Sequence, residues 1–172
     1  MKAVQFLGAN KIAVNDVSEP AIKPGWGLIK ISHCGICGTD LNIYAGTHPR
    51  AKAPLTMGHE FSGELINDTV SFKKGTRVTA YPLISCMKCT PCLSGNKHVC
   101  NTLGLFGIDT DGGMAEYVLI PEDQLIKIPD NMSYKLGALL EPIAVAVHTL
   151  RETDFKPGDN AIVFGCGTIG LC

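Results

Sequence analysis

The sequence predicts a mainly β fold with helices toward the C-terminal end, on two observations. Residues 1–135 contain short runs of strand-forming residues bounded by turn signals such as Pro24-Gly25 and Lys74-Gly75. After Asp130 the pattern changes to helix start signals followed by longer apolar segments. Many short strands at this spacing are typical of a barrel or a sandwich.

The elements expected along the chain follow from these local signals. Strand-forming runs predict six strands, at residues 2–7, 12–17, 27–34, 61–66, 77–80 and 115–120. Ser133 or Asp130 can cap a helix that runs through residues 138–140. Pro142 can start a second helix, over 143–150, because proline is tolerated in a first turn. A turn at 156–159 then precedes an apolar segment, 161–164, that we expect to be a strand.

Composition bounds the class of protein. The chain has 172 residues, 45% hydrophobic and 18% charged, which indicates a folded globular chain with room for one domain and part of another. A formal net charge of −1 without a basic stripe argues against nucleic-acid partners, including a zinc-ribbon type of binder, and against anionic membranes. No apolar stretch approaches the ~20 residues of a membrane span. Eight cysteines without a secretory signal favour a reducing compartment, and we expect a cytoplasmic protein.

Four cysteines within fifteen residues form the strongest local motif. Cys86, Cys89, Cys92 and Cys100 have the spacing C-x2-C-x2-C-x7-C, which suits a tetrahedral zinc site closed to substrate. Disulfides are an alternative, with three possible pairings, but they persist mainly in secreted chains. An iron–sulfur cluster is another, although the bacterial run C-x2-C-x2-C-x3-C-P has a shorter last gap.

A second set of candidate metal ligands is dispersed along the chain: Cys37, His59, Glu60 and Glu141. Cys34 and Cys37 alone could be read as half a zinc finger or as a redox pair, and His59 alone as a hydrogen-bonded core residue. Glu141 is more informative, because a carboxylate in an apolar segment is costly unless it is paired or bound to metal. A set of cysteine, histidine and carboxylate suits a catalytic zinc that keeps one position open.

Six motifs in a fixed order give the chain a family resemblance. They are GICGTD (35–40), MGHEFSG (57–63), the four-cysteine loop, DGGMAEY (111–117), LLEPIAVAVHTL (139–150) and GCGTIG (165–170). Together they resemble the N-terminal part of a zinc-containing medium-chain alcohol dehydrogenase. Glu141, where other alcohol dehydrogenases have a cysteine ligand, is similar to the polyol, butanediol and threonine dehydrogenase branch.

The resemblance implies a domain organisation. Residues 1–152 would form a GroES-like catalytic domain, with a structural zinc lobe at about 84–103 held by the four cysteines. Residues 153–172 would be the first strand and turn of a truncated α/β Rossmann domain. A homo-oligomer is possible by the same resemblance.

The resemblance also implies roles for single residues in the oxidation of a polyol or secondary alcohol to a ketone, with hydride passing to NAD(P). Cys37 and His59 would be ligands of a catalytic zinc, and Glu60 and Glu141 would ligate it directly or through water. Thr39 would take the alcohol proton, and Asp40 would orient the histidine ligand. Many relatives continue the proton relay with a histidine at the position of Asn42. Since an amide is no base near neutral pH, either water or His48 would have to replace it.

The glycines Gly165, Gly167 and Gly170 have the spacing of a dinucleotide-binding turn after a strand. The helix that should follow, and the acidic residue about 20 positions later, lie beyond Cys172. We therefore expect little or no dehydrogenase activity from these 172 residues alone, and we expect 161–164 to be disordered, to pair with another chain or to promote aggregation. The alternative function is a non-catalytic truncated domain held by structural zinc.

Overall fold

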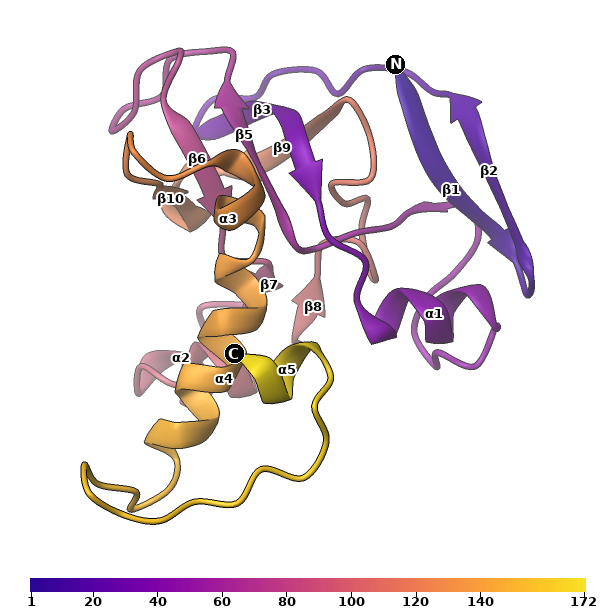
Figure 1. Ribbon diagram of the computed structural model, residues 1–172. Helices are drawn as coiled ribbons and strands as arrows, with labels where there is room; N and C mark the ends of the chain where they lie inside the picture. The colour runs from indigo at the N-terminus through magenta and orange to yellow at the C-terminus, as the bar shows by residue number, and fades with distance from the viewer.

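A curled five-stranded antiparallel sheet forms the centre of the computed structural model, which describes residues 1–172 (Figure 1). The strand order is β10-β6-β5-β3-β9. The strands are β3 (Trp26–Cys34), β5 (Phe61–Leu65), β6 (Arg77–Ala80), β9 (Tyr117–Pro121) and β10 (Leu125–Lys127). The longest strand, β3, pairs with β5 on one side and with the edge strand β9 on the other. The expected mainly β architecture is confirmed.

Two smaller sheets flank the central one. A three-stranded sheet has the order β2-β1-β4, with β1 (Lys2–Gly8), β2 (Lys11–Asp16) and β4 (Leu55–Thr56). A short ribbon joins β7 (Leu83–Ile84) to β8 (Gly104–Leu105). This ribbon closes the base of the segment that carries the four cysteines.

Helices are short except for one. They are α1 (Gly38–Tyr44), α2 (Thr90–Leu93), α3 (Tyr134–Ala138), α4 (Leu140–Arg151) and α5 (Thr168–Leu171), with 3₁₀ turns η1 (Lys97–Val99) and η2 (Glu122–Gln124). Figure 1 shows α4 leading away from α3 and the central sheet. None of these helices has the length and apolarity that crossing a bilayer requires.

Two apolar clusters hold these layers together. The larger is formed mainly by residues of the central sheet and includes Ile29, Phe61, Leu65 and Val78, all essentially inaccessible to solvent. The smaller joins β1 and β4 to α1 through residues that include Ile43. Because Phe61 follows directly after Glu60, and Ile43 lies in the helix that begins after Cys37, packing of the two clusters also positions both candidate ligands.

Most predicted elements occur within one or two residues of their expected bounds. Ser133, not Asp130, caps α3, since its Oγ accepts a hydrogen bond from the Leu136 amide at 3.2 Å. Helix α4 begins at Leu140, so Pro142 lies within the first turn and does not start the helix. The sequence missed α1, α2, the edge strand β10 and the two-residue strands, and the helix expected beyond Cys172 already begins as α5.

The strand predicted at 161–164 is absent. These residues form no regular element and pair with no strand, and Ile162 and Phe164 are 81% and 93% exposed. A strand requires hydrogen bonds from a neighbour, and no other strand of this chain lies beside the segment. The only regular element that follows is the four-residue α5.

Candidate functional site

Cys37, His59 and Glu60 converge at one end of the central sheet. Strands β3 and β5 are antiparallel with Cys34 opposite Phe61, so the segment leaving β3 and the segment entering β5 lie side by side. The Gly35 amide donates to the Glu60 carbonyl at 2.6 Å, which continues the ladder beyond the strands. As a result, one ligand atom from each of Cys37, His59 and Glu60 lies within 4.8 Å of the others.

A cluster of glycines fixes the peptide before His59. Gly58 has φ of +93°, a conformation that favours glycine, and its carbonyl accepts a hydrogen bond from the Gly113 amide at 2.8 Å. Gly107 and Gly112 pack directly on the Gly58 backbone, where a Cβ on either would overlap it. The segment 111–117 therefore packs directly on the segment 57–63, and this close contact is possible because glycines form it.

The electrostatic surroundings of Cys37 favour its thiolate. A hydrogen bond from His59 lowers the pKa of Cys37 and outweighs the opposing effect of burial, and the Thr39 backbone and side chain lower it further. The Cys37 Sγ lies 3.6 Å from the Thr39 Oγ1. For His59, burial lowers the pKa, but the hydrogen bond to Cys37 and the charge of Asp40 together raise it above its usual value. The pair is therefore arranged to place negative charge on sulfur.

Two buried polar atoms in this region lack protein partners. They are the His59 Nδ1 and the Asp40 Oδ1, while the other Asp40 oxygen accepts from the Cys37 amide at 2.8 Å. Burial raises the pKa of Asp40. A buried imidazole nitrogen without a hydrogen bond, beside a thiol and a carboxylate, is costly in an isolated protein but is what a bound cation would satisfy. The residues present therefore fit a metal ion such as zinc.

Glu141 lies near this cluster but outside the 4.8 Å group. It sits in the first turn of α4, partly buried. Burial raises the pKa of Glu141 above its usual value. The charge of His59 lowers this pKa, and the carboxylate of Glu60 raises it further. The structure thus brings three of the four predicted ligands together and places the fourth within electrostatic range.

The four cysteines of the lobe form a compact second cluster. The Sγ atoms of Cys89 and Cys92 are 3.4 Å apart, those of Cys89 and Cys100 are 3.8 Å apart, and those of Cys86 and Cys92 are 4.0 Å apart. Four sulfurs at a Zn–S length of about 2.3 Å in a tetrahedron would be separated by about 3.8 Å. A disulfide would require about 2.05 Å, and all four cysteines are free. The disulfide alternative is therefore wrong, and the donor set fits a tetrahedral metal.

Backbone amides support this cluster. The Cys86 and Thr102 amides donate to the Cys100 Sγ at 3.2 and 3.4 Å. Amide hydrogen bonds, from Lys88 first, lower the pKa of Cys86 to about 6, whereas burial raises the pKa of Cys92 to about 12. Four thiolates this close together, two of them buried, call for a cation at the centre.

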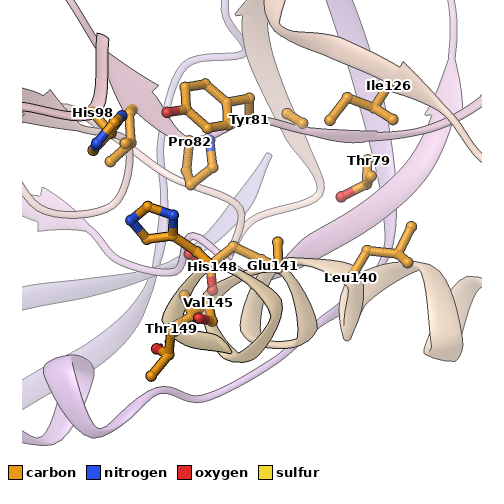
Figure 2. Close-up of a pocket in the computed structure, with 13 residues that line it drawn as sticks. Thr79, Tyr81, Pro82, His98, Ile126, Leu140, Glu141, Val145, His148 and Thr149 are labelled. Atoms are coloured by element: carbon orange, nitrogen blue, oxygen red, sulfur yellow. Dashed lines mark hydrogen bonds between the residues drawn. The ribbon is translucent and has the colours of Figure 1, made fainter. Parts of the chain in front are cut away.

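A cavity of about 410 Å³ extends from Glu141 along α4 (Figure 2). Residues of β6 and the following segment form the opposite wall, and His98 of η1 lies at one end. The lining is largely apolar, with few polar groups, among them Tyr81 and His148. No sequence pattern pointed to Tyr81, His98 or His148, because they meet only through the packing of the cysteine lobe against α4.

The remaining predicted residues lie elsewhere. Asn42 is exposed on α1, and its carbonyl accepts from the amides of Thr47 and His48. The Nδ1 of His48 accepts from the amides of Arg50 and Ala51 at 3.4 and 3.3 Å, so this nitrogen is engaged in its own turn. Among the glycines of the C-terminal motif, Gly165 has φ of +97° and Gly167 precedes α5, in a segment that is exposed throughout.

Comparisons with known proteins agree on one family. The alcohol dehydrogenase GroES-like domain matches residues 23–130. The chain is 40% identical to (R,R)-butanediol dehydrogenase of Bacillus subtilis strain 168, over 99% of this chain and 53% of that protein. It is also 40% identical to L-threonine 3-dehydrogenase of the same organism, over 95% and 49%.

A solved structure shows the same relationship. The alcohol dehydrogenase RspB of Escherichia coli CFT073, crystallised with NADH, superposes with a TM-score of 0.92 at 32% identity, covering 99% of this chain and 51% of that one. The chain thus spans about half the length of the relatives it matches.

Proposed function

Because the chain belongs to the zinc-containing medium-chain alcohol dehydrogenases, a family of oxidoreductases, we propose that it carries the zinc-binding catalytic part of a dehydrogenase that oxidises a polyol or secondary alcohol to a ketone. The observation that carries the proposal is the convergence of Cys37, His59 and Glu60 around a buried imidazole nitrogen without a protein partner.

Each residue of the site has a proposed task. Cys37 and His59 would hold zinc, and Glu60 and Glu141 would complete its surroundings directly or through water. Zinc, when bound, supplies Lewis acidity that makes an alcohol easier to deprotonate. Thr39, whose hydroxyl lies 3.6 Å from the Cys37 sulfur, would receive that proton. Asp40 fixes the amide of Cys37 and adds negative charge beside His59, which favours a cation at the cluster.

Cofactor binding is proposed for the complete dehydrogenase. Relatives are about twice as long as this chain, and RspB was crystallised with NADH. We propose that residues 1–152 form the catalytic domain and that 153–172, with Gly165, Gly167 and Gly170, begin a cofactor domain for NAD(P). The exposed state of that segment supports this, since apolar residues such as Phe164 would be buried by such a domain. The 172 residues alone are then expected to have little or no activity.

A second candidate function rests on the cysteine lobe. Its four sulfurs are arranged for metal independently of the Cys37 cluster. A chain that fills only this site would be a non-catalytic domain held by structural zinc.

Elemental mass spectrometry of the purified chain tests the first proposal against the second. We expect about two zinc ions per chain, falling to about one in Cys37→Ser. Cys34→Ser is the matched control, because Cys34 belongs to the same C-x2-C pair but lies outside the ligand cluster, and it should retain both ions. About one ion in the unaltered chain, unchanged in Cys37→Ser, would overturn the catalytic proposal and favour the structural one.

A further inference from the structure

Two histidines that belong to neither cluster meet at one end of the cavity. His98 comes from η1 in the cysteine lobe and His148 from α4, and both line the cavity (Figure 2). Their ring centroids are 5.1 Å apart and the ring planes are inclined by 68°. The two rings therefore approach edge to face across the junction between the lobe and the helix.

This separation matches that of two imidazoles bound to one ion. At a Zn–N length of about 2.0–2.1 Å, an ion lies about 3.2 Å from each ring centroid, so tetrahedral coordination separates the centroids by about 5.2 Å. The two rings need no movement toward each other to share a metal. Binding one ion requires a nitrogen of each ring to face the common point, and both residues are exposed.

A carboxylate stands beside one of the two histidines. The Nδ1 of His148 is 3.7 Å from the Oε1 of Glu152, one helical turn further along, with side chains 52% and 69% exposed. Spacing of four residues on a helix places both groups on one face. Two imidazoles and a carboxylate are a usual donor set for zinc and similar divalent ions, with water in the remaining position.

Two basic residues are close to the pair in the sequence, Lys97 before His98 and Arg151 in the last turn of α4 with His148. Lys97, the neighbour of His98, lines a different cavity, which it shares with Asp123. The wall next to His148 on α4 includes apolar Val145 and also Thr149, whose hydroxyl donates to the Val145 carbonyl at 3.0 Å.

We propose that His98 and His148, assisted by Glu152, form a third metal site for a borderline divalent cation such as Zn²⁺. An ion at this site connects the cysteine lobe to α4 and closes that end of the cavity. The site uses no residue of the Cys37 cluster, so the proposal is independent of the catalytic one.

Zinc titration against a chromophoric chelator, on the chain with its tighter sites already filled, tests the proposal. The unaltered chain is expected to take up one further ion. His98→Ala and His148→Ala should each lose that ion and keep those held by cysteines, and Glu152→Gln should weaken it. His33→Ala is the control, because His33 is an exposed histidine on β3 outside the cavity.

Long-range ¹H–¹⁵N spectra of the imidazoles provide a second readout that needs no variant. Addition of zinc should shift the ring nitrogens of His98 and His148 and leave those of His33 in place. The proposal is overturned if no further ion binds, if both alanine variants still bind it, or if zinc leaves both pairs of ring nitrogens unchanged.

Discussion

Gly112→Ala should empty the Cys37 cluster although Gly112 contributes no ligand. The added Cβ would lie 2.6 Å from the Gly107 Cα and 2.8 Å from its nitrogen, and closer still to the Gly58 carbonyl oxygen. Since real Cβ contacts essentially never fall below 3.0 Å, the backbone must move by more than about 0.4 Å. Gly112 does not have a positive φ, so the effect is steric and not conformational.

The size of that shift determines the outcome. His59 follows Gly58 directly, and metal sites tolerate ligand displacements of only about 0.2 Å. Overpacking of this kind typically costs about 1–3 kcal/mol of stability, and each kcal/mol lowers Tm by about 2–4 °C in a domain of this size. We expect Gly112→Ala to remain folded with a lower Tm and to lose one of the two zinc ions expected at the cysteine-containing clusters.

Elemental analysis and thermal unfolding measure both effects. Gly104→Ala is the matched control, because its added Cβ would be 3.4 Å from the nearest atom, an ordinary contact. The double variant Gly112→Ala/Cys37→Ser should bind as much zinc as either single variant, which identifies the lost ion as that of the Cys37 cluster. Full zinc occupancy and an unchanged Tm in Gly112→Ala would refute the reasoning.

Two further predictions concern reactivity and stability. Burial, with the charges of Asp40 and Glu60, raises the pKa of the Cys34 thiol to about 12, so its thiolate fraction should stay negligible up to pH 10. Peptide mapping after maleimide treatment at pH 8 should therefore find label on exposed Cys166 and Cys172 but not on Cys34, and rapid labelling of Cys34 would contradict this. Ser133→Ala should lower the free energy of unfolding in urea by about 1 kcal/mol through loss of the α3 cap. Exposed Ser18, which makes no hydrogen bond, provides the control, and equal effects of Ser133→Ala and Ser18→Ala would count against the cap.

The sequence predicted those parts of the fold whose signals are local. Strand β3 was evident from its length and residue types, and the cap of α3 from Ser133. Helix α1 was missed because its first turn is stabilised by an unusual arrangement, in which Asp40 accepts the amide of Cys37 at the cap position. Residues 161–164 have strand-forming composition but no partner, and composition alone cannot show whether a partner is present.

The candidate site shows the same division. The close spacing of the four cysteines along the chain predicted that their sulfurs lie together, and in the structure they lie within 4.8 Å of one another. Cys37 and His59 lie together because of the register of β3 against β5. Local sequence signals do not reveal that register, so only the family resemblance predicted that the two residues share a site. His98 and His148 come from segments about fifty residues apart, and no local sequence pattern predicts that they meet.

The two metal clusters differ in how much chain must be ordered before they exist. Cys86 and Cys100 are only 14 residues apart, so closing that loop costs little entropy and can precede formation of the sheet. The Cys37 cluster requires β3 and β5 to have paired, and Glu141 joins from about a hundred residues further along. An ion that also binds the unfolded chain stabilises the native state by less than its affinity for the native state implies. Only the difference between its affinities for the native and unfolded states contributes. The cysteine lobe is therefore suited to capturing its ion early in folding, whereas the Cys37 cluster can bind one only after the domain has formed.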